Sequence, residues 1–181
     1  HEKMSSKIVS KSFIADILNA HGISPSRVSN LIQGGGRLGK ILSSEVDVDK
    51  MDYLVRDAYY AGVAYGVTDV ERLLYSIRLF KGDVVVDEGG LEAAESLLIN
   101  RNMMYRTVYR HHTKRIAESM LCKGLSHILE DGGDIEEISS MDDIACVNLF
   151  RNYGGYPTEM IEKIEGRKLF KKVFSQPLMN F

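Results

Sequence analysis

The segment from Asp47 to Asp57 constrains this chain most, because its polar and apolar residues recur at helical spacing. Drawn as a helix at about 100° per residue, the segment sorts its side chains into faces. One face collects carboxylates, an ammonium and a phenol: Asp49, Asp57, Lys50 and Tyr53. The opposite face is apolar: Met51, Leu54, Val55, Ala58 and Gly62. A surface helix needs only one apolar stripe and one solvated face, so the polar grouping indicates a polar site.

A third face of the same helix carries Asp52 and Arg56, which are four residues apart. Opposite charges at this spacing pair across one helical turn. The segment therefore predicts a surface ion pair in addition to the polar site.

Size and charge narrow the classes of protein to which the chain can belong. It has 181 residues, 44% of them hydrophobic and 27% charged, which is typical of a soluble globular domain. The net charge is −2, so the composition does not favour nucleic acid as a partner. A basic pocket inside a nearly neutral protein remains compatible with these totals.

The cysteines and the apolar runs exclude several other classes. Cys122 and Cys146 are the only cysteines, and without a C-x-x-C spacing they predict neither a zinc site nor a disulfide framework. The sequence contains no apolar run of about 18 residues and no signal peptide, so it predicts no membrane association. We expect a cytoplasmic protein.

Helical periodicity dominates the chain, and the expected fold class is mainly α with a small β element. Gly, Pro and capping residues bound the expected helices, and Ser43 or Ser44 is the expected cap of the third. The expected helices are 6–19, 25–33, 46–60, 69–79, 91–112, 113–130, 141–152 and one that starts near Pro157. Residues 82–87 are the strand candidate, since they are β-branched and bounded by glycine. We expect a domain of residues 1–80 followed by an extension of residues 81–181, or one continuous domain.

The glycine-rich segment from Gly34 to Lys40 matches the spacing of a phosphate-binding loop, G-x-x-x-x-G-K. That loop requires a hydroxyl residue next, to reach magnesium, and Ile41 has none. The residues before it also indicate a helix rather than a strand. A loop between two helices is therefore the better interpretation.

A second polar grouping lies on the expected helix 91–112. Its apolar stripe starts with Leu91, Ala94, Leu97 and Leu98. The same stripe then reaches Arg101, Tyr105 and Tyr109, so Arg101 falls where the pattern predicts burial. A buried guanidinium needs an anionic partner. That partner is either a structural carboxylate or a substrate phosphate, which arginine binds in bidentate fashion.

These motifs together resemble a known family. The run Asp47–Asp57, followed by Tyr60-x-Gly62, Asp69-x-x-Arg72, Arg101-Asn102-x-x-Tyr105 and Val108-Tyr109-x-His111, resembles the HD-domain phosphohydrolases. It is most similar to the branch that hydrolyses deoxynucleoside triphosphates (dNTPs) to deoxynucleoside and tripolyphosphate. The resemblance implies an HD-type helical bundle, of which this chain would be the C-terminal part.

The resemblance also implies a metal. Family members hold a divalent ion with a histidine, an adjacent His-Asp pair and a distant aspartate, and Asp49 matches the last position. The resemblance does not distinguish Mg, Mn, Fe, Ni and Zn. This chain contains no His-Asp dipeptide, so we expect that it alone neither retains the metal nor is active.

Roles for other residues follow from the same resemblance. His1, in a His-Glu dipeptide, would line the reaction centre and protonate the departing sugar oxygen. The resemblance assigns the remaining matched residues to the dNTP: Lys50 and Arg101 to phosphate, and Tyr53, Asp57, Tyr105 and Tyr109 to sugar and base. It also implies a homo-oligomer.

Two alternatives to dNTP hydrolysis stay open. The chain could be a metal-free nucleotide-binding or oligomerisation module that retains half of a pocket. It could also belong to an HD hydrolase of another phosphate ester, in which the phosphate contacts persist and the sugar contacts differ.

Overall fold

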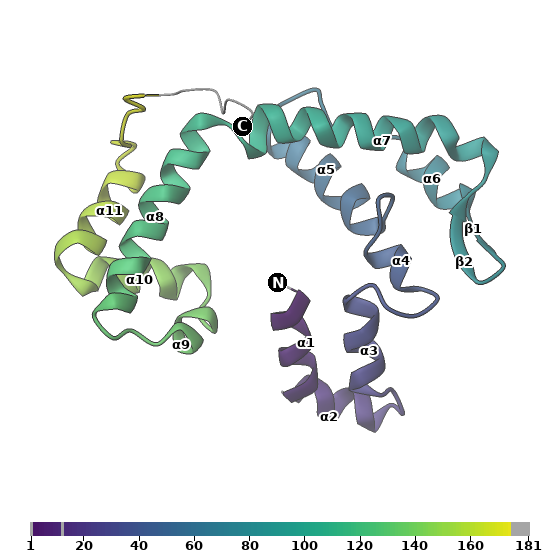
Figure 1. Ribbon diagram of the computed structural model, residues 1–181, viewed down its shortest axis with the longest axis horizontal. Coiled ribbons are helices and arrows are strands. Elements are labelled where there is room, and N and C mark those ends of the chain that lie inside the picture. The colour runs from purple at the N-terminus through teal and green to yellow at the C-terminus, as the bar shows by residue number, and fades with distance from the viewer. Residues whose placement is uncertain (1, 12, 175–181) are drawn as a thin grey trace, which may run out of the picture. The chain divides into compact units, whose positions relative to one another are not determined.

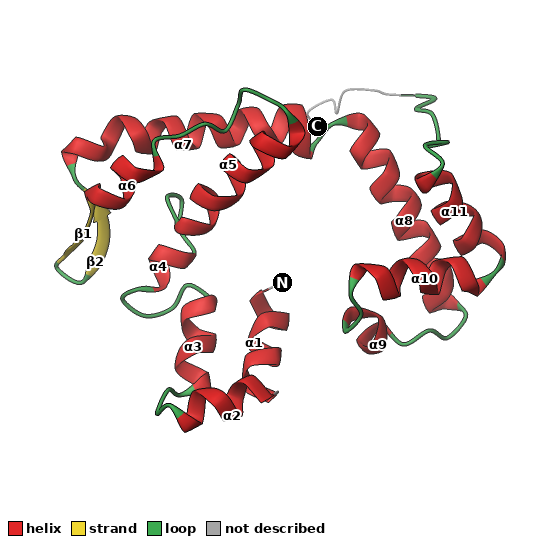
Figure 2. Cartoon of the chain, turned by 180° about the vertical axis from the view of Figure 1, so that it is seen from behind, coloured by secondary structure: helices red, strands yellow, loops and turns green. Residues whose placement is uncertain are grey.

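A computed structural model describes residues 2–11 and 13–174 of the chain, and this part is mainly helical. Figure 2 shows that strands are confined to a single hairpin. The expected fold class, mainly α with a small β element, is therefore confirmed. The chain forms two compact units, His1–Thr107 and Val108–Phe181. The expected boundary at residues 80/81 falls inside the first unit, at the hairpin turn.

The first unit begins with three short helices and a single helical turn. They are α1 (Glu2–Lys11), α2 (Phe13–Ala20), α3 (Pro25–Ile32) and α4 (Gly39–Leu42). The expected helix 6–19 thus corresponds to α1 and α2. Pro25 starts α3, where its fixed φ suits the first helical turn. Helices α1 and α3 pack against each other (Figure 1).

Helix α5 (Val48–Ala61) contains all of the motif Asp47–Asp57 except its first residue. The side chain of Asp47 caps its first turn, so the expectation of a Ser43 or Ser44 cap was wrong. Gly62 ends the helix with a left-handed φ of 66°. Met51, Leu54 and Ala58 are buried, as the apolar face predicted.

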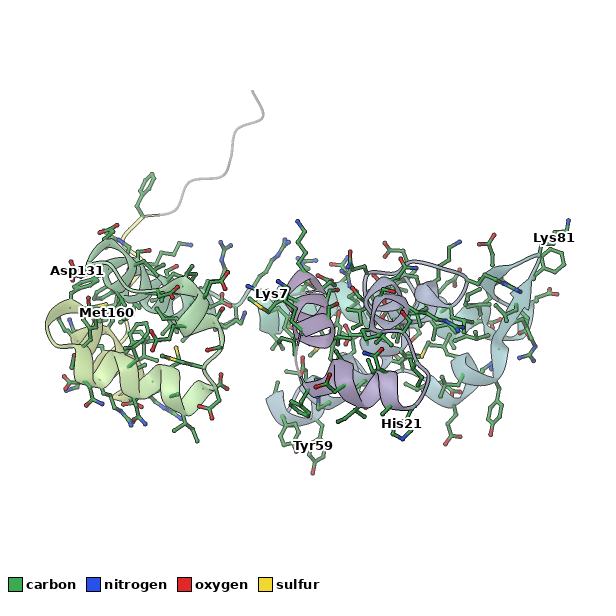
Figure 3. All side chains as sticks on the ribbon, turned by 90° about the horizontal axis from the view of Figure 1, so that it is seen from below. Lys7, His21, Tyr59, Lys81, Asp131 and Met160 are labelled. Atoms are coloured by element: carbon green, nitrogen blue, oxygen red, sulfur yellow. The ribbon has the colours of Figure 1, made fainter. Side chains whose placement is uncertain are left out.

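Two residues of α5 show which of its surfaces face solvent. Val55, expected on the apolar face, is 39% exposed because it lines a surface cavity beside α6 (Val70–Ser76). Tyr59 projects outward from the helix and is almost fully accessible (Figure 3). The apolar stripe is therefore narrower than the sequence indicated.

Helix α6 is shorter than expected because the chain changes to a hairpin at Ile77. Strand β1 (Ile77–Phe80) pairs antiparallel with β2 (Asp83–Val86), with Ile77 opposite Val86. Lys81 and Gly82 form the turn, and both have positive φ, 51° and 92°. Two such residues suit the twist of a tight hairpin. Lys81 lies at the tip (Figure 3).

A 3-10 turn, η1 (Glu88–Gly90), leads into α7 (Leu91–Met104), which packs against α5 and α6 (Figure 1). Ala93, Ala94, Leu97 and Met104 are buried, whereas Leu91 and Leu98 are exposed, contrary to the expected stripe. A π-helical turn, η2 (Tyr105–Tyr109), follows. The expected single helix 91–112 is thus an α-helix with a π-helical end.

The second unit consists of α8 (His112–Glu130), α9 (Ile135–Ser139), α10 (Asp143–Tyr153) and α11 (Gly155–Glu165). Ile128, Phe150 and Ile161 form its core. Asp142 caps α10 by accepting a hydrogen bond from the Ala145 N–H at 2.7 Å. No helix in the described ranges combines the length and apolar character that crossing a bilayer requires.

One glycine fixes how the loop after α5 lies on that helix. Gly66 is buried and has a φ of 115°. A Cβ atom at this position would lie 2.7 Å from the Leu54 carbonyl oxygen and 2.9 Å from the Ala58 Cβ. The loop backbone therefore lies directly against the buried face of α5, where only glycine fits.

Candidate functional site

A buried carboxylate organises the start of α5. Asp47 is 2% exposed, and its Oδ1 accepts a hydrogen bond from the backbone N–H of Lys50 at 2.8 Å. Its Oδ2 accepts from the Ser44 N–H at 3.0 Å and from the Lys50 Nζ at 2.7 Å. This one carboxylate thus caps the helix, fixes the preceding loop and neutralises a cation.

Lys50 is directed into this network rather than outward. Its Nζ also donates to the Ser44 carbonyl oxygen at 2.6 Å, and its side chain is only 15% exposed. Removing one member of such a buried pair leaves its partner without a counter-charge, which costs about 2–5 kcal/mol, and least where the partner keeps other hydrogen bonds. Lys50 therefore has a structural role at the beginning of the helix, and its predicted contact with phosphate stays a prediction.

Arg101 of α7 lies against α5 and meets two of the predicted aromatic residues. Its guanidinium donates a hydrogen bond to the phenol oxygen of Tyr53. The guanidinium carbon lies 5.0 Å from the centroid of the Tyr105 ring, within range of a cation–π interaction. The structure thus brings together three predicted site residues that are distant in the sequence.

The surroundings of Arg101 favour its charged form. The hydrogen bond to Tyr53 raises the pKa of Arg101 above its ordinary value, whereas desolvation by burial acts in the opposite direction. The nearby Tyr105 and Glu45 reinforce the upward shift. The guanidinium therefore stays protonated throughout the physiological pH range.

What Arg101 lacks is an anion. Among the described residues, no carboxylate lies within ion-pair distance of it, although Glu45 acts on it from further away. Its Nε–H is buried and has no hydrogen-bond partner in the same part of the chain. Buried polar groups are nearly always satisfied, so an unused donor on a charged group points to a ligand. Of the two partners that the sequence left open, the structural carboxylate is not found there.

The carboxylates of α5 lie in two different environments. Asp49 is exposed in the first turn of the helix, whereas Asp57 is half-buried and has partners of its own. No group of three or more His, Cys, Asp or Glu side chains in the described ranges is arranged to hold a metal. The described residues therefore do not by themselves fit the divalent ion that the resemblance implies, and we derive no chemical step through it.

Two further predicted residues are placed differently. His1 lies outside the described residues. Tyr109 is half-buried at the end of the π-helical turn and belongs to the second unit. The roles predicted for both stay predictions.

Sequence reasoning missed Asp47. In the sequence Asp47 is simply the first residue of the motif, although its position three residues before Lys50 is the spacing of a helix cap. Two aspartates, Asp47 and Asp49, precede Lys50, and only the point at which the helix begins decides which of them is the cap.

Comparison with known families assigns the chain. Residues 68–181 match the family described as HD associated region. The chain belongs to this family. This assignment confirms the resemblance to the HD-domain phosphohydrolases, and it covers α6, the hairpin, α7 and the whole second unit.

Curated relatives are longer than this chain. An uncharacterized protein of Methanocaldococcus jannaschii, MJ1154, is 39% identical over 163 residues, covering 87% of this chain and 36% of that protein. The uncharacterized protein YwfO of Bacillus subtilis is 46% identical over 83 residues, covering 46% of this chain and 19% of that protein. The deoxynucleoside triphosphate triphosphohydrolase SAMHD1 homolog of Dictyostelium discoideum is 26% identical and matches 100% of this chain and 37% of its own length.

Solved structures share the fold. A hypothetical protein from Aquifex aeolicus superposes with a TM-score of 0.80 at 32% identity, covering 93% of this chain and 48% of that one. A phosphohydrolase from Bacteroides thetaiotaomicron, BT4208, superposes with a TM-score of 0.69 at 19% identity, covering 88% and 48%. The chain thus spans less than half the length of these relatives.

Proposed function

We propose that this chain forms the substrate-anchoring part of an HD-family phosphohydrolase, and that the intact enzyme hydrolyses dNTPs to deoxynucleoside and tripolyphosphate. The observation that carries the proposal is Arg101, a half-buried cation held by Tyr53 and Tyr105 without a carboxylate within ion-pair distance in the described ranges. The similarity to a deoxynucleoside triphosphate triphosphohydrolase supports the choice of substrate.

In this proposal Arg101 binds the phosphate chain. A phosphate offers the charge-assisted, bidentate acceptors that a guanidinium prefers. Tyr53 and Tyr105 hold the guanidinium in position before the ligand arrives, which lowers the entropic cost of binding. Tyr53 and Asp57 would contact the sugar, while the role that the resemblance gives Tyr109, at the sugar or base, stays a prediction.

Lys50 and Asp49 have smaller parts in the proposal. The Lys50 ammonium would add a phosphate oxygen to the two oxygens that it already contacts, since it has three N–H donors. Asp49 would give its carboxylate to a divalent ion whose other ligands, and the His1 region, belong to the intact enzyme. Homo-oligomer formation is part of the same proposal.

The test is product analysis with the intact protein, a dNTP and a divalent metal. We expect release of tripolyphosphate together with deoxynucleoside, and Arg101→Gln should lower kcat/KM by about 10²–10³-fold, as for the loss of one preorganised anion contact. Arg106→Gln, at an exposed position in the adjacent π-helical turn, is the matched control and should retain activity.

Other products would identify the alternatives. Release of inorganic phosphate or pyrophosphate, without tripolyphosphate, would show cleavage inside the triphosphate chain and reject the proposed reaction. Hydrolysis of another phosphate ester, with the dNTP left intact, would favour the alternative HD hydrolase. Binding of dNTP without any turnover, and without metal, would favour the nucleotide-binding module. An Arg101→Gln variant with unchanged kcat/KM would reject the phosphate-binding role of Arg101, on which the proposal rests.

A further inference from the structure

The glycine-rich segment between α3 and α4, visible as a loop in Figure 1, borders a surface cavity of about 420 Å³ in the first unit. All of the residues that line the cavity except Leu31 are exposed. Three polar side chains line it, those of Arg27, Asn30 and Arg37. Three leucines, Leu31, Leu38 and Leu79, supply its apolar lining. None of these residues belongs to the Arg101 site, so this cavity is a separate feature.

The loop that forms the cavity rim is tightly folded. A Cβ atom on Gly35 would lie 2.1 Å from the Asn30 Oδ1, and one on Gly39 would lie 2.3 Å from the Gly34 carbonyl carbon. A side chain on Gly35 would push the loop away from α3, and one on Gly39 would separate the two ends of the loop. The glycines therefore serve to close the loop over Asn30, which gives the cavity a defined wall.

The charges of the cavity are not balanced. Neither Arg27 nor Arg37 has an ion pair or a side-chain hydrogen bond within the described part of the chain, and no Asp or Glu lines the cavity. The neighbouring Lys40 is different, because Asp83 of the hairpin accepts from its Nζ at 2.7 Å. Two guanidinium groups thus line one cavity without an ion-pair partner among the described residues, while Lys40 is paired with Asp83.

We propose that this cavity binds a small organic phosphate. Arg27 and Arg37 would bind the phosphate oxygens, because guanidinium groups recognise phosphate through paired, charge-assisted hydrogen bonds. Leu31, Leu38 and Leu79 would contact an apolar or planar aromatic part of the same molecule. The volume lies within the range of small-molecule sites, and the mixture of an apolar lining with a few polar groups is typical of them.

The proposal is tested by calorimetry with naphthyl phosphate and inorganic phosphate, in the presence of a chelator and at low salt. We expect naphthyl phosphate to bind at least about tenfold more tightly, because only it can use the leucines. Arg27→Gln and Arg37→Gln should each weaken its binding by about tenfold. Arg37→Lys should restore part of the affinity, since it keeps the charge but not the planar fork.

A matched control separates this site from other arginines of the first unit. Arg106→Gln, at an exposed position outside the cavity lining, should leave naphthyl phosphate binding unchanged. Both cavity arginines are exposed, so circular dichroism of their variants should show an intact fold. Equal affinities for the two probes, or binding lost only in Arg101→Gln, would overturn the proposal. Displacement of naphthyl phosphate by random-sequence single-stranded DNA at lower concentration would overturn it too, in favour of a nucleic-acid surface.

Discussion

Lys50 and Arg101 are both withdrawn from solvent in the first unit, but their charges are balanced in different ways. Lys50 is bound by a buried carboxylate and a carbonyl oxygen, all within one loop and helix start. Arg101 is held by a phenol and an aromatic ring, without a carboxylate within ion-pair distance in the described ranges. The first cation is satisfied by the fold, whereas the second retains a charge that a bound anion can neutralise.

Asp47→Ala gives the largest expected effect on stability. It removes a helix cap and leaves the Lys50 ammonium without its carboxylate, so we expect a loss of about 3–5 kcal/mol in the free energy of unfolding. Urea unfolding followed by circular dichroism measures it, and hydrogen exchange of the α5 amides locates it. The control is Asp142→Ala, an exposed cap of α10, which should cost only about 1 kcal/mol. Equal losses would show that the Asp47–Lys50 pair contributes nothing beyond capping.

Lys50→Met should cost less, about 2 kcal/mol, because Asp47 keeps the two backbone N–H donors from Ser44 and residue 50. The same urea titration measures this change. Lys114→Met, which removes an exposed i,i+4 pair with Glu118, should change stability by no more than about 0.5 kcal/mol. If Lys50→Met weakened dNTP binding as strongly as Arg101→Gln without loss of stability, the contrast between the two cations would be wrong.

Arg101→Met should affect ligand binding more than stability, which is the opposite of what we expect for Lys50→Met. Because no carboxylate in the described ranges lies within ion-pair distance of Arg101, we expect the free energy of unfolding to change by no more than about 1 kcal/mol. Affinity for a dNTP should nevertheless fall by about tenfold or more, since a charge-assisted contact is lost. Calorimetry with the intact protein measures the affinity. A stability loss of about 2 kcal/mol or more would instead assign Arg101 to the structural class of Lys50.

Asp52→Asn gives the smallest expected effect. Asp52 and Arg56 form the predicted i,i+4 pair, with 3.1 Å between the Arg56 Nη2 and the Asp52 Oδ2, but both side chains are more than half exposed. Solvent screening limits such pairs, so we expect a loss of about 0.3–0.5 kcal/mol that shrinks further in high salt. Thermal melts at low and high salt test this. A loss as large as that of Lys50→Met would show that burial does not explain why the Asp47–Lys50 pair stabilises the fold more than the Asp52–Arg56 pair does.

The sequence predicted the local features of α5 well. The helix, its buried Met51 and Leu54, and the Asp52–Arg56 pair all follow from spacing alone, because each depends on neighbours within two turns. The direction of the Lys50 side chain could not be predicted from the spacing of residues, since it depends on the conformation of the loop at Ser44. The meeting of Tyr53 with Arg101 depends on the packing of α5 against α7, and only the position of Arg101 on an apolar stripe indicated it.

Features set by distant partners were harder to predict. Residues 77–79 were expected to belong to a helix, but they lie in strand β1, which pairs with residues 83–86, because tertiary hydrogen bonds override local propensity. Leu91 and Leu98 lie on the stripe that the period predicts, yet they are exposed because the neighbours of α7 cover a different side of it. Periodicity identifies that a helix has a buried side, while the neighbouring elements decide its width.

The close approach of Gly66 to α5 has a genetic consequence. Every missense substitution of a glycine codon introduces at least a β-carbon, and here that atom would overlap the main chain and Ala58. A random screen for inactive alleles should therefore return position 66 together with the ligand-binding positions, although Gly66 itself makes no contribution to chemistry. Only a measurement of folded protein, made beside the activity assay, would tell the two kinds of allele apart.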